Sequence, residues 1–451
     1  MDATIERIAA YARDFRFASL PGAAVHETKR RIIDTLGCAL GGYDDAPCRI
    51  ARAMAARVKC ATGGARILGT AHRTLPELAT FANGVMARYL DGNDTLPGGG
   101  GHPSDIIAPM LAVAESTRAD GKALVNAIAL AYEIYFALFR GASMRERGLD
   151  HVFYTAVASA VGAGKLLGLD TRKLGQAVSL AVTPNLPLHA TRRGDLSMWK
   201  GVASGNAARN GVFAALLAAE GMTGPDKAIE GSHGLRELLG KFELGELAPP
   251  GGELSITRSN LKFFLSEYHS QSPITAALQL SREVKADEIE SITIHTYWFA
   301  WHEIGSEPEK WHPTTRESAD HSLPYIISAV LIDGAFSDAV FSDERIRDPK
   351  VHALADKVSV KEDPEFTRRF SAEIPCRLEV RTRAGGVKSA VVDYPRGHYR
   401  NPMTDEEVET KFRALAARVL PSAQVKSALE RLWKIDQEGE AGIVFDVLAR
   451  S

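Results

Sequence analysis

Five side chains suited to acid–base or ionic chemistry stand where predicted helices begin or end. Asp91 and Thr95 lie in YLDGNDTLPGGGGHPSD (89–105), where four consecutive glycines separate them from His102. His151 opens a predicted helix in LDHVFYTAVASA, and Lys200 opens another in SMWKGVASGN. Histidine exchanges protons near neutral pH, and a lysine near packed helices calls for an anionic partner. These residues predict acid–base chemistry on an anionic ligand.

The glycine-rich stretch fits neither a calcium loop nor a phosphate loop. Counted from Asp91, a calcium loop requires glycine at its sixth position and a carboxylate at its twelfth, where this chain has Leu96 and His102. A phosphate loop requires Gly-Lys-Ser/Thr, whereas His-Pro-Ser follows these glycines. What remains is carboxylates, a glycine hinge and an imidazole that opens the next helix. A flexible surface loop with a solvated histidine is the alternative.

Further basic and imidazole side chains gather at the ends of elements in the second half of the chain. They are His269 and Gln271 in SEYHSQSP, Arg316 and His321 in TRESADHSLPY, and Arg396 in PRGHYRNP. Such an excess of cationic groups is typical of a site for a polycarboxylate. The alternative for each cluster is a capping or turn role. For His151 it is a cap, and for Lys200 an exposed ammonium lying over Trp199.

The composition is that of a globular protein without an obvious affinity for polyanions. The chain has 451 residues, which suggests two or three domains, or one large domain with a satellite. Its formal net charge of −2 argues against binding to nucleic acid or anionic membranes. No apolar run approaches the ~18 residues that span a bilayer, and the start lacks signal-peptide features. A cytoplasmic location is therefore expected.

The four cysteines predict neither a metal centre nor disulfides. They stand at Cys38, Cys48, Cys60 and Cys376, and no two of them form a CxxC pair. A zinc knuckle or cysteine-ligated iron–sulfur cluster is therefore not expected. We interpret the four residues as small buried hydrophobes.

Hydrophobic periodicity predicts a mainly α protein with a small α+β part. Helices are expected over 26–42, 74–91, 104–119, 121–140, 152–168, 171–183 and 201–221, with Thr74 and Ser104 as N-caps. The segments rich in Ala and Gly predict helices that approach closely in a buried bundle. After 248–252, strands are expected at 290–299, 376–382 and 388–395, with helices at 322–334 and 348–360. A helix with an acidic first turn begins near Thr404.

Taken together, these motifs resemble the MmgE/PrpD family almost from end to end. The resemblance rests on RRIIDTLGCALGG, LDGNDT…GGHPSD, LDHVFYTAVASAVGAGKLLGLD, SMWKGVASGNAARNGVFAALLAAEGMTGP, EYHSQSPITAAL, RESADHSLPYIISAVLIDG and PRGHYRNPMTDEE. It implies an all-helical domain built from residues 1–255 and 401–451, an inserted α+β lid at 256–400, and a homodimer. The active-site pattern of the family falls on Asp91, Thr95, His102, His151 and Lys200.

The activities known in the family all act next to a carboxylate. They include 2-methylcitrate dehydratase, cis-aconitate decarboxylase and an epimerase of a small dicarboxylate, and none needs an iron–sulfur cluster. Compared with the decarboxylase branch, the loop from Thr95 to His102 has one more glycine. Gln271 stands where that branch has a catalytic histidine, with His269 two residues earlier. HPSD, LDHV and YHSQ are more similar to the dehydratase branch, which we therefore favour.

The resemblance predicts elimination of water from a β-hydroxy polycarboxylate without metal or other cofactor. His102 and His151 are the acid and base candidates, Lys200 would pair with a substrate carboxylate, and Asp91 would orient an imidazole. Thr95 would hydrogen-bond the substrate. His269, Gln271, Arg316, His321 and Arg396 are the expected substrate-binding residues. Decarboxylation, epimerisation, a polycarboxylate-binding protein without catalysis and a purely structural helical protein remain the alternatives.

Overall fold

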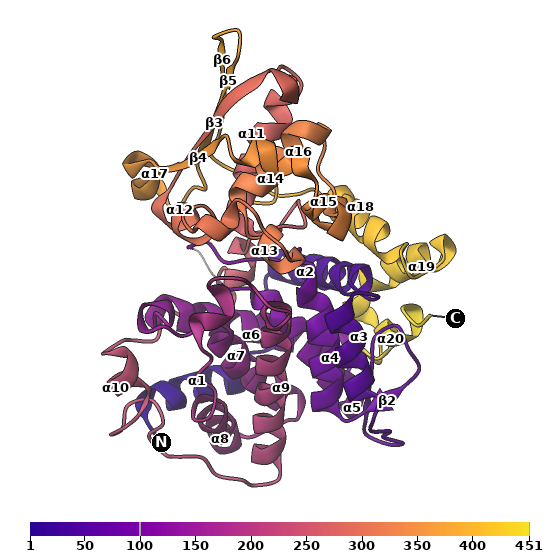
Figure 1. The fold of residues 1–451 in the computed structure, drawn as a ribbon. Coiled ribbons are helices and arrows are strands. Elements are labelled where there is room, and N and C mark those ends of the chain that lie inside the picture. Colours follow the sequence, from indigo (N-terminus) through magenta and orange to yellow (C-terminus); the bar gives the residue numbers. More distant parts are fainter. Residues whose placement is uncertain (99–100, 451) are drawn as a thin grey trace.

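Two groups of packed side chains, each around its own hydrophobic core, account for most of the chain. The computed structural model describes residues 1–98 and 101–450. One core combines residues from both parts of the sequence, from Ile5 to Leu261 and from Met403 to Leu448. The second core lies between Ile274 and Val392. We call these parts the helical region and the α+β region; Figure 1 shows the second standing above the first.

The helical region is built from two stretches of helices and one small hairpin. Its elements are α1 (Ala3–Asp14), α2 (Gly22–Gly41), α3 (Ala46–Ala55), β1 (Ala65–Arg66), β2 (Arg73–Thr74), α4 (Pro76–Tyr89), α5 (Ile107–Thr117), α6 (Gly121–Gly141), α7 (Val152–Leu166), α8 (Thr171–Val182), α9 (Trp199–Ala219), α10 (Leu235–Leu239), α18 (Asp405–Ala416), α19 (Ser422–Leu432) and α20 (Ile443–Val447). The prediction of a mainly α chain is confirmed.

Glycines set the spacing between α9 and its two main neighbours. A Cβ on Gly84 of α4 would come within 2.9 Å of the Gly205 Cα on α9. A Cβ on Gly211 of α9 would lie 2.2 Å from the carbonyl oxygen of Ala156 on α7. Neither distance leaves room for a side chain, so these helices pack backbone against backbone. The predicted close approach of the Ala- and Gly-rich helices is confirmed.

One helix of the bundle has the length and the apolar composition of a membrane-spanning helix. Among the described residues, only α6 is long and apolar enough to cross a bilayer, with a mean hydropathy of 1.4 in its most apolar window. However, 83% of that window is buried inside the protein, as expected for a core helix. Figure 1 shows α6 between other helices of the bundle.

The α+β region is organised by a four-stranded sheet with the strand order β4-β3-β5-β6. Its elements are α11 (Gln271–Leu280), β3 (Ile289–Thr296), α12 (Trp298–Ile304), α13 (Arg316–Ala319), α14 (Leu323–Asp333), α15 (Asp343–Ile346), α16 (Pro349–Ala355), β4 (Val358–Glu362), α17 (Pro364–Arg369), β5 (Cys376–Thr382) and β6 (Val387–Val392). The predicted strands are confirmed, and β5 and β6 form the expected antiparallel hairpin. The helix predicted at 348–360 is wrong in its second half, because β4 begins at Val358 and pairs in parallel with β3.

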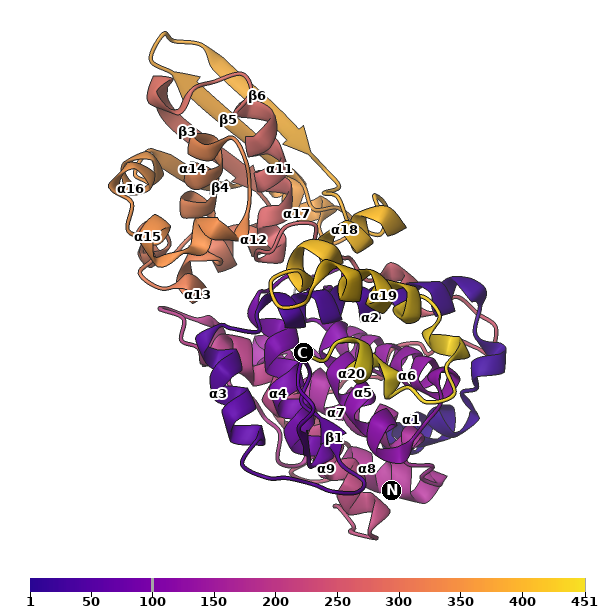
Figure 2. The ribbon, with the colours of Figure 1, turned by 90° about the vertical axis from the view of Figure 1, so that its right-hand side faces the viewer.

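Helix α18, near the end of the chain, packs against α2, near its beginning. Thr404 and Glu407 form a capping box that starts it, in line with the predicted acidic first turn. The ammonium of Lys411 pairs with Asp34 of α2 at 2.7 Å, and it donates to the carbonyls of Gly92 (2.6 Å) and Lys262 (2.7 Å). Figure 2 shows α18 and α19 beside α2, on the side toward the α+β region. One buried lysine therefore fixes two loops from distant parts of the sequence.

Several local predictions need correction. Thr74 does not cap α4, because it lies in β2 and its hydroxyl donates to the Ala55 carbonyl at 2.9 Å. Ser104 lies within a short 3₁₀ helix (Pro103–Ile106), where its hydroxyl accepts from the Asn93 amide. Gly99 and Gly100 lie outside the described residues, so the glycine hinge stays a prediction. The domain boundaries after residues 255 and 400 stay predictions as well.

The cysteines follow their predicted role with one exception. Cys38, Cys48 and Cys376 are buried, and Cys60 is partly exposed. All four are free thiols.

Candidate active site

Side chains of both regions enclose a buried cavity of about 50 Å³, which we call the inner cavity. Of the residues predicted from the sequence, Asp91, Thr95, His102, His151, His269 and His321 line it. The other lining residues are Arg88, Arg145, Arg192, Lys262, Glu267, Tyr268, Phe299 and Glu303. The structure thus brings six of the ten predicted site residues to one space.

Asp91 stands at the centre of the charged groups. It follows the end of α4 with a φ of 52°, a left-handed conformation that aspartate tolerates better than most residues. Its carboxylate pairs with Arg88 of α4 and with the Lys262 ammonium, the latter at 2.6 Å. Burial would raise the pKa of Asp91, but Arg88, Lys200 and Lys262 together hold that pKa well below its ordinary value. Asp91 is therefore a fixed anion.

Lys200 lies behind Asp91 and does not line the cavity. Its ammonium is 3.3 Å from Asp91 Oδ2 and 3.0 Å from Asp320 Oδ2, and the side chain is 1% exposed. The alternative of an exposed lysine over Trp199 is therefore wrong. The expected anionic partner exists, but here it consists of two carboxylates of the protein, one of them from the α+β region.

His102 is held by hydrogen bonds at both ring nitrogens. Nδ1 lies 2.6 Å from the Asp94 carbonyl oxygen, which only accepts, so Nδ1 carries the proton. Nε2 then accepts from the Arg88 guanidinium at 2.7 Å. Burial, followed by the charges of Arg88 and Lys262, lowers the pKa of His102 well below its ordinary value. The imidazole is therefore neutral. Arg88 bonds to both Asp91 and His102 and so links the two side chains.

His151 presents a free nitrogen to the cavity. Its Nδ1 is 2.9 Å from Asp150, a buried carboxylate that Arg192 holds at 3.0 Å. Its Nε2 is buried and has no hydrogen-bond partner among the described residues. Burial lowers the pKa of His151 to about 4, although Asp150 acts to raise it. This ring lies 5.4 Å from the His102 ring, centroid to centroid.

Glu267 and His269 close the side of the cavity that faces the α+β region. The Glu267 carboxylate accepts from the His269 backbone amide at 2.6 Å, and His269 Nδ1 bonds to the Tyr297 hydroxyl. Burial raises the pKa of Glu267 to about 8, against the opposing charge of Lys262, and so favours its neutral acid form. Burial also lowers the pKa of His269 well below its usual range.

Asp91, Asp320 and His321 have the spacing of a three-ligand metal site, since one ligand atom of each lies within 4.8 Å of the others. The Lys200 ammonium already contacts both carboxylates. Burial and the Lys200 charge lower the pKa of His321 to about 4. A metal ion would have to compete with a buried ammonium for the same oxygens, so the donor set fits a lysine better than a metal.

Three further predicted residues lie away from the cavity. The Gln271 amide bonds to the backbone N–H and carbonyl of Phe264, which fixes the segment before α11. Arg316 contacts Asp320 at 3.5 Å and lies 4.9 Å from the centroid of the Tyr89 ring. Arg396 pairs with Glu407 of α18. In this arrangement the three side chains support neighbouring elements.

The lining residues that sequence reasoning missed include Arg88, Lys262, Glu267 and Arg145. Two of them carried a signal. Arg88 lies three residues before Asp91 in a largely apolar segment, VMARYL, which is the spacing of an ion pair. Lys262 interrupts the apolar run in NLKFFL, and a lysine in such a run calls for a buried partner.

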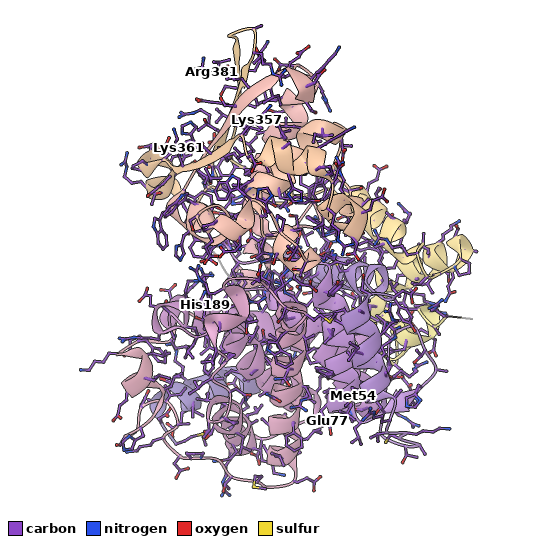
Figure 3. All side chains as sticks on the ribbon, in the orientation of Figure 1. Met54, Glu77, His189, Lys357, Lys361 and Arg381 are labelled. Carbon is purple, nitrogen blue, oxygen red and sulfur yellow. The ribbon has the colours of Figure 1, made fainter. Side chains whose placement is uncertain are left out.

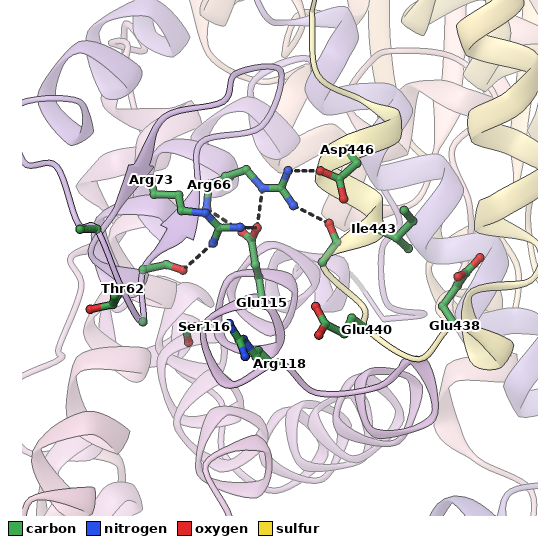
Figure 4. A pocket seen from close by; sticks show the side chains of 14 residues that line it. Thr62, Arg66, Arg73, Glu115, Ser116, Arg118, Glu438, Glu440, Ile443 and Asp446 are labelled. Carbon is green, nitrogen blue, oxygen red and sulfur yellow. Dashed lines mark hydrogen bonds and ion pairs between the residues drawn. The ribbon is translucent and has the colours of Figure 1, made fainter.

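A larger cavity of about 530 Å³ lies at the other side of the helical region, between α5 and the C-terminal segment. Figure 4 shows its central ion pairs, in which Arg66 and Arg73 converge on Glu115 and Arg66 also reaches Asp446. We call it the Arg66–Glu115 pocket. Its buried carboxylate, Glu115, accepts from the Arg66 backbone N–H at 2.7 Å as well.

Comparison with known proteins identifies relatives along nearly the whole chain. The chain is 30% identical to the "2-methylcitrate dehydratase" of Escherichia coli (strain K12), over 88% of this chain and 87% of that protein. It is 31% identical to the "2-methylcitrate dehydratase" of Cupriavidus necator, over 92% and 90%. The mitochondrial "2-methylcitrate dehydratase" of Yarrowia lipolytica is 28% identical, over 95% and 86%.

These relatives are carbon–oxygen lyases, the class of enzyme that the sequence motifs predicted. The sequence models of two domains match as well. The MmgE/PrpD N-terminal domain matches residues 6–244, and the MmgE/PrpD C-terminal domain matches residues 264–435. The chain therefore belongs to the MmgE/PrpD family.

Proposed function

We propose that this protein is a hydro-lyase that removes water from a small β-hydroxy polycarboxylate, such as 2-methylcitrate or citrate. The observation that carries the proposal is the free Nε2 of His151, which is buried in a cavity lined by guanidinium and ammonium groups. A neutral base beside fixed cations suits removal of a proton next to a carboxylate. The names of the relatives support the same reaction class.

The cations bind and polarise the substrate. Arg88, Arg192 and Lys262 are the inner cations of this cavity. Arg192 has one guanidinium nitrogen buried without a hydrogen-bond partner among the described residues. A substrate carboxylate would satisfy that nitrogen and neutralise the excess positive charge. As the α-proton leaves, the same cations stabilise the charge that builds on the carboxylate.

His151 acts as the base. Its Nε2 takes the α-proton, the electron pair of that C–H bond forms the C=C bond, and the C–O bond to the hydroxyl breaks. The Asp150 carboxylate, 2.9 Å from Nδ1, stabilises the imidazolium that results. This arrangement is that of a carboxylate that orients a catalytic histidine.

The departing hydroxyl needs a proton to leave as water. Glu267 favours its neutral acid form because burial raises its pKa to about 8, and it lines the same cavity as His151. Two titratable groups whose environments push their pKa values apart divide the acid and base roles between them. His102 carries its proton on Nδ1, so its Nε2 is a second candidate for the base rather than for the acid, once Arg88 turns toward a substrate carboxylate.

Asp91, Thr95 and Lys200 complete the site. Asp91 anchors Arg88 and Lys262, and Lys200 fixes Asp91 in turn, so Lys200 acts as a positioning residue in this arrangement. The Thr95 hydroxyl donates to the Gly101 carbonyl at 3.1 Å and can accept a bond from the substrate. The protein residues supply all charges of this mechanism, and we assign no metal or other cofactor to it.

Ultraviolet absorbance tests the reaction directly. The purified enzyme, mixed with 2-methylcitrate or citrate after dialysis against a chelator, should produce the absorbance of a conjugated enoate. Carbon dioxide released from cis-aconitate would replace the proposal by a decarboxylase. Exchange of an α-proton for solvent deuterium without net dehydration would replace it by an epimerase or isomerase. Carboxylate binding without any turnover would leave a binding protein.

A homodimer in the cytoplasm is the proposed setting. Exposed apolar side chains accompany α9 and the loop before it, at Leu186, Leu188, Met198, Trp199 and Phe213. Such a concentration is typical of surfaces that associate. Light scattering on the purified protein should give twice the chain mass, and a monomer would contradict this part of the proposal.

A further inference from the structure

An outer cavity of about 620 Å³ adjoins the inner cavity. Arg145, His151, Phe299 and Glu303 line both spaces, so these four residues form the wall between them. The inner cavity is far smaller than the ~300–1,000 Å³ of typical ligand pockets, whereas the outer cavity falls within that range. A polycarboxylate on its way to His151 therefore has the outer cavity as an adjoining space of suitable size.

The wall is a contact between the two regions of the molecule. Arg145 belongs to a short 3₁₀ helix (Arg145–Arg147) of the helical region, and Glu303 belongs to α12 of the α+β region. The guanidinium of Arg145 pairs with the Glu303 carboxylate and lies 4.2 Å from the centroid of the Phe299 ring. Side chains alone make this contact, so it can open without a change in the secondary structure.

A second guanidinium faces the same helix from the outer cavity. Arg193 pairs with Glu307 just after α12 at 2.7 Å, and its Nη1 is 3.4 Å from His302 Nε2. Burial, followed by the charge of Arg145, lowers the pKa of His189, which lines the same cavity. Figure 3 places His189 on the side of the helical region that faces the α+β region. Two arginines of the outer cavity thus pair with acids of the α+β region, Arg145 with Glu303 and Arg193 with Glu307.

We propose that the outer cavity is a capture site for the anionic substrate, in which a substrate carboxylate replaces Glu303 on Arg145. A free carboxylate presents the same two oxygens as Glu303, so the exchange conserves the ion pair of Arg145. Losing Glu303 opens the wall, and the substrate then moves past Phe299 toward the free Nε2 of His151. This inference rests on the proposed function, because it takes a small polycarboxylate as the ligand.

The role differs from that of the residues that act on the reacting atoms. Arg145 speeds the arrival of an anion, so its charge contributes to kcat/KM and to the salt dependence of association. Steps after arrival depend on His151, Glu267 and the inner cations. Removing the charge of Arg145 is therefore expected to separate kcat/KM from kcat.

The test compares Arg145→Gln with Arg140→Gln, a matched control. Arg140 is an exposed arginine at the end of α6 that lines neither cavity. Steady-state dehydration is measured at several ionic strengths, and stopped-flow binding of tricarballylate, which lacks the hydroxyl and cannot be dehydrated, is followed by tryptophan fluorescence, since Trp298 lines the outer cavity. Melting temperatures confirm that the variants fold.

For Arg145→Gln we expect kcat/KM and the tricarballylate association rate to fall at least tenfold, with kcat within threefold of the wild type and a weaker salt dependence. Glu303→Gln, which frees Arg145, should raise the association rate. Equal losses in Arg140→Gln, an unchanged association rate in Arg145→Gln, or a parallel fall of kcat would overturn the capture site. Wild-type protein that binds tricarballylate but dehydrates nothing would contradict the proposed function alone. Wild-type protein that does not bind tricarballylate contradicts the capture site.

Discussion

The inner cavity and the Arg66–Glu115 pocket are both built from charged side chains, but they differ in how those charges are satisfied. In the Arg66–Glu115 pocket, Glu115 receives two arginines and a backbone N–H. In the inner cavity, by contrast, His151 Nε2 and one Arg192 nitrogen are buried without a hydrogen-bond partner among the described residues. The Arg66–Glu115 pocket is also about ten times larger in volume. The two spaces therefore differ in that the inner cavity holds buried polar atoms whose hydrogen bonds a ligand would have to supply.

The comparison predicts the largest loss of activity for the histidines of the inner cavity. His151→Ala and His102→Ala should each lower kcat/KM by about 10²–10⁴-fold, because each removes a positioned acid or base. Arg73→Ala in the Arg66–Glu115 pocket should leave kcat/KM within twofold. The assay is the absorbance of the enoate product, with circular dichroism to confirm the fold. Normal turnover by both histidine variants would show that the assignment of the site is wrong.

Lys200→Ala should lose at least about a hundredfold in kcat/KM, because Asp91 and Asp320 lose the ammonium that lies between them. Lys200→Arg restores the charge but not the shape, and should recover only part of the activity. An unaffected pH profile together with a small loss would instead indicate a purely structural lysine.

Glu115→Gln tests whether the Arg66–Glu115 pocket contributes to stability and not to catalysis. Glu115→Gln removes the carboxylate that pairs with Arg66 and Arg73. Because Arg66 keeps Asp446 and Arg73 is partly exposed, the free energy of unfolding should fall by about 2 kcal/mol. The kcat of the folded variant should remain that of the wild type. Denaturant titration and kinetics at a temperature well below the transition measure the two effects separately. A loss of kcat without a loss of stability would assign a functional role to the Arg66–Glu115 pocket.

The buried histidines also predict acid sensitivity. His151 has a pKa of about 4 in the folded protein and one near 6.5 in the unfolded chain, so the unfolded chain binds more protons between these values. Its contribution to stability is present above pH 6.5 and is lost as the pH falls to about 4. The total is on the order of 3 kcal/mol. His151→Gln should flatten the pH dependence of unfolding in this window, whereas His233→Gln, an exposed control, should not.

The smallest effect is expected for Arg396. Its guanidinium pairs with Glu407 at the start of α18, away from both cavities. Arg396→Gln should therefore change kcat/KM by less than about twofold and stability by about 1 kcal/mol at most. A tenfold rise in KM would show that the arginine reaches the substrate in another arrangement of the two regions.

How far the sequence predicts the site depends on how local the contacts are. Asp91, His102 and His151 were found because each lies in a motif whose chemistry can be read within a few residues. Lys262 contacts Asp91 across 171 positions of sequence, and periodicity carries no information about such a pair. Asp150 directly precedes His151 in the sequence, but its ion pair with Arg192, 42 positions away, follows only from the fold.

The prediction of the fold from the sequence is limited in the same way. The helices of the bundle were predicted because their apolar stripes are long and regular. The strand β4 was predicted as part of a helix, since VSVKE has five residues and is largely exposed at the edge of the sheet. Its parallel pairing with β3 is a tertiary contact. The Thr74 cap failed because Thr74 satisfies the Ala55 carbonyl in another element.

The contacts of Lys411 have a consequence for the order in which the protein is made. During synthesis, α2, the loop at Gly92 and Lys262 leave the ribosome long before α18 does. Until α18 emerges, Asp34 lacks the cation that pairs with it, and the carbonyls of Gly92 and Lys262 lack the donor that fixes them. The nascent chain can therefore collapse around its helices early, but it completes the loops around Asp91 only when the last part of the chain arrives.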